Sequence, residues 1–297
     1  MHKSIPKIFP LASAALAAVL AACSPAYAVT LKNEQWSVEI EPRTLAITAK
    51  PVSDAPADAS TGGPPHKVSR TRATGSTAQW WWDDHAWQVS ASLAGADLEL
   101  SITAEAAGPL AILNQPMGKG LLWPRAEGAY VPAGDKSWRD FLLKNYDEFA
   151  TTEDISLPLW GMDYGTYTLS WIMEQPFDNH GKIQAEGDGF SISLEHQFTS
   201  LSRKTPMTLM LHLGEGNDLL SGAKRYRAWL IETGRYETLA DKITRTPNAA
   251  KLIGAPFVYL WGDGLLAPRD VKDWAGFIHL LKGDGELAGE IRGHLSD

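Results

Sequence analysis

The chain has 297 residues, of which 44% are hydrophobic, enough for one large or two ordinary domains. Its formal net charge of -8 argues against nucleic acid as a partner, because phosphate binding needs a basic face. Its 12 Trp residues suit either a buried aromatic core or a sugar-stacking surface, and the count does not decide between them.

The first 28 residues are predicted to be an export signal rather than part of the fold. A weakly basic start precedes the apolar run Phe9–Ala22, which is too short to span a membrane. The run ends in "LAAC" (Leu20–Cys23), which resembles a bacterial lipobox, whose cysteine is lipidated and becomes the mature N-terminus. The alternative is ordinary signal peptidase cleavage after "AYA" (Ala26–Ala28), which would discard Cys23, the only cysteine. We therefore expect an exported protein, periplasmic or extracellular, that touches a membrane only through a lipid anchor at Cys23.

Residues 29–216 are predicted to form a β-sandwich domain. Apolar residues alternate with polar ones along many short runs, which indicates strands with one buried face. Many such strands separated by Gly, Pro and Asp favour antiparallel sheets packed face to face. The stretch Pro51–Pro65 is expected to be a loop, because its Pro, Gly and small residues cannot build a core. The clearest alternating sets are Trp36, Val38 and Ile40; Val89, Ala91 and Leu93; Tyr167, Leu169, Trp171 and Met173; and Met207, Leu209, Leu211 and Leu213.

Helical spacing replaces the period of two in a predicted linker, residues 217–254. A first helix is expected to be capped by Asp218 and to stop at Gly234. Two shorter helices are predicted, one around residues 239–243 and one that begins at Pro247. The apolar residues that mark the first helix are Leu219, Ala223, Tyr226 and Leu230.

The remaining segment, residues 255–297, contains the apolar strand Phe257–Trp261, a Gly/Asp loop and then helical spacing through Trp274 and Ile278. A lone parallel strand is not stable, since parallel strands need hydrogen-bonded neighbours. We therefore expect this segment to be the start of a truncated β/α barrel, whose other strands lie outside this sequence.

Three stretches resemble bacterial glycoside hydrolases that release α-linked N-acetylgalactosamine, the endo-α-N-acetylgalactosaminidases and the related exo-acting α-N-acetylgalactosaminidases. They are "AKRYRAWLIETGRYETLADKITRTPNAAKLIGAPFVYLWG" (Ala223–Gly262), "LLWPRAEGAYVPAG" (Leu121–Gly134) and "SLPLWGMDYGTYTLSWI" (Ser156–Ile172). The resemblance implies a mainly β fold, a galactose-mutarotase-like antiparallel sandwich followed by a helical linker and the first βα unit of a TIM-type (β/α)8 barrel.

The resemblance also implies a retaining glycosidase acting on α-linked N-acetylgalactosamine or similar sugars, with an Asp nucleophile and a Glu acid/base. That chemistry needs two carboxylates about 5–5.5 Å apart, carried by later barrel strands in this family. We therefore assign no catalytic residue and expect the catalytic pair to lie outside this chain. The alternative is a non-catalytic cell-surface protein, a carbohydrate-binding or structural sandwich.

Two sets of residues are candidates for sugar binding. Trp123, Arg125 and Glu127 alternate and are expected to share one strand face or rim; the alternative is an Arg–Glu pair at the sandwich–barrel interface. Trp261 and Asp263 follow the predicted barrel strand, where barrel enzymes place their active sites; the alternative is a packed Trp and a turn-forming Asp.

Other chemistry is not indicated. "WWWDDH" (Trp80–His85) could suggest a metal site, but adjacent side chains diverge, so we expect a strand ending in an Asp-Asp turn and no bound metal. Asp163 is expected to be a turn residue. Neither "GEG" nor "GDG" has the spacing of a nucleotide-binding loop, and no G-x-S-x-G nucleophile signature is present, so no cofactor is expected.

Overall fold

The computed structural model describes residues 28–254 except 217, residues 273–283, and the single positions 285 and 289. The chain divides into two compact units, one ending at Tyr236 and the other beginning at Glu237. None of the described helices is long and apolar enough to cross a lipid bilayer. The predictions for the lipobox with Cys23 and for the barrel strand with Trp261 and Asp263 fall outside the described residues, and they stay predictions.

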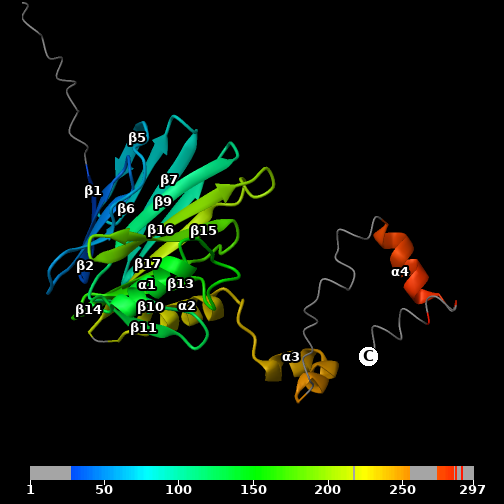
Figure 1. The fold of residues 1–297 in the computed structure, drawn as a ribbon. Helices are drawn as coiled ribbons and strands as arrows, with labels where there is room; N and C mark the ends of the chain where they lie inside the picture. The colour runs from blue at the N-terminus through cyan, green and yellow to red at the C-terminus, as the bar shows by residue number, and fades with distance from the viewer. Residues whose placement is uncertain (1–27, 217, 255–272, 284, 286–288, 290–297) are drawn as a thin grey trace, which may run out of the picture. The chain divides into compact units, whose positions relative to one another are not determined.

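The first unit, whose strands are labelled where there is room in Figure 1, contains one large antiparallel sheet. It has nine strands in the order β11-β10-β13-β14-β17-β8-β7-β6-β5. Its strands are β5 (Val68–Ala73), β6 (Thr77–Trp82), β7 (Trp87–Ala94), β8 (Asp97–Thr103), β10 (Gly120–Trp123), β11 (Ala129–Pro132), β13 (Leu159–Asp163), β14 (Tyr167–Met173) and β17 (Met207–Glu215).

Two antiparallel four-stranded sheets face the large sheet across the core, in the orders β1-β2-β3-β4 and β12-β15-β16-β9. Where β4 meets β9, the Thr61 N–H donates to the Asn114 carbonyl at 2.7 Å, so the two small sheets join edge to edge. The predicted antiparallel β-sandwich is therefore confirmed. The strands are β1 (Val29–Lys32), β2 (Trp36–Glu41), β3 (Ala46–Pro51), β4 (Ala57–Ser60), β9 (Gly108–Pro116), β12 (Phe149–Ala150), β15 (Asn179–Glu186) and β16 (Gly189–Phe198).

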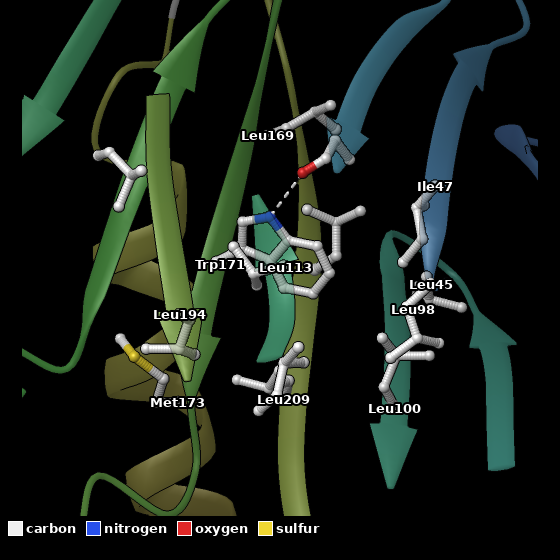
Figure 2. Packing of buried hydrophobic residues seen from close by; sticks show 14 of the residues in the cluster. Leu45, Ile47, Leu98, Leu100, Leu113, Leu169, Trp171, Met173, Leu194 and Leu209 are labelled. Carbon is white, nitrogen blue, oxygen red and sulfur yellow. Dashed lines mark hydrogen bonds between the residues drawn. The ribbon is translucent and has the colours of Figure 1, made fainter. Parts of the chain in front are cut away.

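The core between the layers is rich in tryptophan. Figure 2 shows Trp171 of β14, whose Nε1 donates to the Ala59 carbonyl of β4 at 3.0 Å and so bridges the two layers. Trp160 of β13 makes a similar bridge, with its Nε1 donating to Gln115 Oε1 of β9 at 2.8 Å. The alternating sets predicted from the sequence supply this core, which confirms their strand assignment. The largest fully buried side chains include Trp36, Trp80, Trp82, Trp87, Trp123, Trp160 and Trp171, so more than half of the tryptophans serve the core.

Helix α2 (Ser221–Glu232) covers part of the outer face of the nine-stranded sheet, through a cluster of Leu159, Ile172, Met210 and Trp229. Every residue of β14 is buried, because the core covers one face and α2 the other. The helix ends before Gly234, at φ 67°, as predicted. Asp218 is not its N-cap: Leu220 occupies that position, and Asp218 Oδ1 instead accepts from the Leu220 N–H at 3.2 Å.

Two elements of the first unit depart from the sequence predictions. Strand β4 lies inside the expected loop Pro51–Pro65, pairs with β3 and buries Ala59, so that loop prediction is wrong in its centre. Its sequence, "ADAS", has only small or polar side chains, so it shows no alternation of large apolar residues. Helix α1 (Lys136–Asn145) begins at the N-cap Asp135, which accepts from the Ser137 and Trp138 N–H groups, and buries only Leu142.

The second unit has short helices in its described parts. Helix α3 (Leu239–Arg245) begins with a capping box between Thr238 and Asp241, and the segment from Pro247 is the 3₁₀ helix η1 (Pro247–Leu252). Both match predicted helical segments. Helix α4 (Trp274–Lys282) matches the helical spacing predicted through Trp274 and Ile278.

Candidate functional site

A cavity of about 330 Å³ opens on the outer face of the nine-stranded sheet, between β10, β11 and β13 and the segment leading into α2. It contains two of the residues singled out in the sequence, Trp123 and Glu127. Its lining is otherwise mostly apolar: Leu122, Pro124, Ala126, Gly128, Ala129, Tyr130, Ser156, Leu157, Leu159, Gly161, Ser170, Leu219, Leu220 and Ala223. An apolar cavity with a few polar groups is the usual form of a small-molecule site.

The turn after β10 decides where the predicted residues lie. The strand ends at Trp123, and the Gly128 N–H donates to the Arg125 carbonyl at 2.7 Å, which closes a turn. Ala126 and Gly128 both have positive φ there. Arg125 and Glu127 therefore stand on a turn rather than on a continuing strand. Glu127 and the end of β10 at Trp123 line the cavity, while Arg125 is not among the lining residues.

Arg125 interacts with aromatic rings instead of with Glu127. Its guanidinium carbon lies 5.2 Å from the centre of the Tyr146 ring, within reach of a cation–π interaction. No ion pair joins Arg125 to Glu127 among the residues that the structure describes. Trp123 is 1% exposed, and its ring packs edge-to-face against Tyr146 and Phe149 at 5.2 and 5.1 Å. Its Nε1 has no hydrogen-bond partner within the described structure.

Tyr130, which the sequence analysis did not single out, adds a polar group to the cavity. Its hydroxyl donates to Asp163 Oδ2 at 2.8 Å, and this hydrogen bond, followed by burial, raises the pKa of Tyr130. Asp163 Oδ1 also accepts from the Gly165 N–H at 2.6 Å, so Asp163 is the turn residue that was predicted. Gly120 makes room for the Tyr130 ring, because a Cβ at that position would lie 2.3 Å from the phenol oxygen.

The helix beside the cavity is attached to the sheet by polar contacts. The hydroxyls of Thr168 and Ser221 lie 2.8 Å apart in a buried hydrogen bond. Asp97 of β8 accepts from Arg225 Nε at 2.6 Å and lies 2.7 Å from His212 Nδ1. Burial acts to raise the pKa of Asp97, but the hydrogen bonds from His212 and Arg225 outweigh it and hold that pKa below its ordinary value.

The lining determines what the cavity can do chemically. Glu127 is the only carboxylate among the lining residues, and glycoside hydrolysis needs two. The cavity is therefore suited to binding rather than to bond cleavage. Tyr130, 40% exposed, offers a ring to stack on a sugar, and Glu127 offers hydroxyl acceptors.

The sequence matches no protein-family model and no curated protein. The fold is similar to the α-N-acetylgalactosaminidase NagBb from Bifidobacterium bifidum. The ligand-free structure of that protein matches with a TM-score of 0.58 and 16% identity, over 75% of this chain and 42% of that one. Its complex with Gal-NHAc-DNJ matches with a TM-score of 0.55 over the same shares. A galactose mutarotase-like protein from Lactobacillus casei ATCC 334 matches with a TM-score of 0.38 and 11% identity, over 63% of this chain and 99% of that one.

At 16% identity the likeness to NagBb shows a fold related to that of a glycoside hydrolase. This chain spans less than half of the length of that protein.

Proposed function

We propose that this sandwich is part of a glycoside hydrolase that acts on α-linked N-acetylgalactosamine, or a similar sugar, of glycans. The observation that carries the proposal is the fold match to NagBb over 75% of this chain. Support comes from the three stretches of sequence that resemble the same class of enzyme. By that resemblance, cleavage in the intact enzyme retains configuration, and the two catalytic carboxylates belong to a barrel.

The cavity would contribute to this function by holding a sugar unit rather than by cleaving one. Glu127 would accept hydroxyl hydrogens, and Tyr130 would stack on a pyranose ring, with its hydroxyl fixed by Asp163. Trp123 borders the cavity only where β10 ends, because its ring belongs to the buried core and packs against Tyr146 and Phe149.

Activity is tested with the full chain, an aryl α-N-acetylgalactosaminide and mucin-type glycopeptides. We expect no turnover by this chain, because removing essential catalytic groups costs several orders of magnitude in rate. Turnover that persists after removal of host enzymes would place a catalytic pair within these 297 residues. Turnover restored by a barrel from the same class of enzyme would support the proposal.

Sugar binding is tested separately, by titrating N-acetylgalactosamine into the chain and following tryptophan fluorescence. Glu127→Gln should weaken binding, whereas Glu153→Gln should not, because Glu153 is exposed and is not among the cavity-lining residues. If both variants bind equally well, the cavity is not the sugar site. The second candidate function, a non-catalytic carbohydrate-binding sandwich, is favoured if binding occurs and no added barrel restores turnover.

Export and anchoring are the remaining part of the proposal. We propose that Cys23 is lipidated and holds the protein on a membrane, on the strength of "LAAC". A single acyl chain binds a membrane only marginally, so stable anchoring needs a second signal such as another acyl chain. Mass spectrometry of the mature N-terminus would show a lipid-modified Cys23, and Cys23→Ser should release the protein from the membrane fraction. An unmodified mature chain beginning at Val29 would refute the anchor.

A further inference from the structure

Two histidines and an aspartate from separate segments converge at the end of the β6–β7 hairpin. Asp84 and His85 lie in the turn between Trp82 and Trp87, and His66 lies in the segment before β5. One ligand atom from each of the three residues lies within 4.8 Å of the others. From the sequence, Asp83, Asp84 and His85 were not expected to bind a metal, because the side chains of adjacent residues diverge. The fold adds a ligand from a separate segment, because His66, 18 residues upstream of Asp84, lies beside it.

The distances within this His66–Asp84–His85 triad suit a metal ion. Asp84 Oδ2 lies 3.0 Å from His66 Nδ1 and 3.6 Å from His85 Nε2, so both rings direct a nitrogen at the same carboxylate oxygen. A tetrahedral ion with bonds of about 2.0–2.2 Å separates its ligand atoms by about 3.3–3.6 Å. Small side-chain movements would therefore bring all three atoms into coordination.

Both imidazoles rest on buried indoles. The His66 ring stacks on Trp82 with 4.1 Å between the ring centres, and the His85 ring stacks on Trp87 with 4.5 Å between them. Trp82 and Trp87 are paired across the hairpin, and Trp82 Nε1 donates to the Pro42 carbonyl at 2.7 Å. The imidazoles are thus held by a rigid part of the sandwich, as a preorganised ligand set requires.

The turn is fastened to the neighbouring segment next to the triad. The Asp83 N–H donates to the Lys67 carbonyl at 2.8 Å, and Asp83 Oδ1 accepts from Ser69 Oγ at 2.5 Å. These bonds keep Asp84 and His85 beside His66, and they direct Asp83 away from the triad. The Asp84 side chain is 36% exposed and that of His85 49%, so an ion can enter from solvent.

We propose that His66, Asp84 and His85 form a binding site for a divalent transition-metal ion of the Zn²⁺ class. Two imidazoles and one carboxylate favour Zn²⁺, Co²⁺, Ni²⁺ or Cu²⁺ over Mg²⁺ and Ca²⁺, which prefer oxygen ligands. Three protein ligands leave a fourth position for water or another ligand. The triad belongs to the β6–β7 end of the nine-stranded sheet, while the cavity belongs to its β10–β11 end, so the proposal is independent of the proposed function.

The test is a titration of the tag-free full chain, stripped with a chelator, with Zn²⁺ followed by calorimetry and with Co²⁺ followed by visible absorption. We expect one ion per chain and Co²⁺ bands typical of a four-coordinate site. His66→Gln, Asp84→Asn and His85→Gln should each weaken binding at least tenfold, since losing even a hydrogen-bond partner of a metal ligand costs about 10–100-fold.

Two matched controls separate this site from adventitious binding. His180→Asn removes an exposed histidine elsewhere, and Asp188→Asn changes an exposed aspartate in the turn of another hairpin, and neither should alter the affinity. Zn²⁺ should also raise the Tm of the wild-type chain but not that of the triad variants. If His66→Gln fails to fold, Asp84→Asn and His85→Gln carry the test, because their side chains are exposed in a turn. Absence of saturable binding, or equal binding by the triad variants, would overturn the proposal.

Discussion

The two faces of the nine-stranded sheet are built by different means. The inner face packs large side chains, such as Leu169 and Trp171 of β14, into one continuous core. The outer face beneath α2 has a cluster of only four buried apolar residues, Leu159, Ile172, Met210 and Trp229. Next to this cluster, the helix and the sheet both carry small residues where they meet. A Cβ on Gly222 of the helix would lie 2.3 Å from Ser170 Oγ, and a Cβ on Gly214 would lie 1.9 Å from Ser221 Oγ.

This difference shows two ways in which one sheet can be covered. The inner face excludes water by volume, so its stability depends on large apolar side chains. The outer face brings a helix backbone close to the sheet, so its stability depends on the absence of side-chain atoms and on short polar contacts. Substitutions should therefore affect stability in opposite ways on the two faces. Removing side-chain atoms should destabilise the inner face, and adding them should destabilise the outer face.

The largest effect is expected from Trp171→Ala on the inner face. The ring is fully buried, and its loss would leave a cavity and deprive the Ala59 carbonyl of its donor, which should lower the free energy of unfolding by about 3–5 kcal/mol. Urea unfolding would measure this as a lower midpoint. Trp171→Phe is the matched control: it keeps most of the volume and removes the hydrogen bond, and should cost about 1–3 kcal/mol. Equal losses from both would mean that the volume of Trp171 is unimportant.

On the outer face, Gly222→Ala tests whether an added methyl group stabilises or destabilises the protein. Helix propensity alone favours Ala over Gly by about 1 kcal/mol. The new methyl group would instead clash with Ser170, and we expect a net destabilisation of about 1–3 kcal/mol, with faster hydrogen exchange of the α2 amides. Gly134→Ala is the control, because a Cβ there meets nothing within 4 Å. A more stable Gly222→Ala variant would show that the close approach does not matter.

The same difference explains how much could be read from the sequence. The inner face was predictable, because residues such as Val89, Ala91 and Leu93 alternate in the way a half-buried strand requires. The outer face was not, because Thr168, Ser170 and Gly214 look like solvent-facing residues until a helix covers them. Strand β4 was missed for a similar reason, since its small side chains carry no pattern.

The candidate sites show the same limit. Glu127 and Trp123 could be singled out because they are close in sequence, although the turn that redirects Arg125 could not be foreseen. Tyr130 pairs with Asp163, 33 residues away, and His66 meets Asp84 only through the fold. Local patterns do not record contacts of that kind. The predictions on Cys23, Trp261 and Asp263 lie outside the described residues.

A smaller effect is expected from the charged contacts that hold α2 to β8. Asp97→Asn removes the carboxylate that Arg225 and His212 share and should cost about 1–2 kcal/mol at pH 7, because the group is part-exposed. The pKa of Asp97 is lowered in the folded protein, so its contribution is complete above the unfolded pKa of about 3.9 and is lost as pH falls through the folded value.

Urea unfolding at a series of pH values checks this pH dependence of the Asp97 contribution. The difference in stability between wild type and Asp97→Asn should be constant near neutral pH and shrink below about pH 4. Glu99→Gln, at an exposed position of the same strand, serves as the control and should change little. A difference that grows on acidification would contradict the assigned sign.

The smallest effect concerns the buried hydroxyl pair Thr168–Ser221, and it tests whether polar contacts on the outer face are needed or merely tolerated. Thr168→Val and Ser221→Ala should each cost about 1 kcal/mol, since each leaves one buried hydroxyl without its partner. The double variant removes both hydroxyls and leaves neither unpaired. It should therefore lose less than the sum of the two single variants, with a coupling of about 0.5–1 kcal/mol in a double-mutant cycle. The matched cycle joins Ser221→Ala to Thr30→Val, because Thr30 is exposed on β1, and those two losses should add. If the Thr168 and Ser221 losses also add, the hydroxyls act independently, and the small residues beneath α2 are required for their size alone.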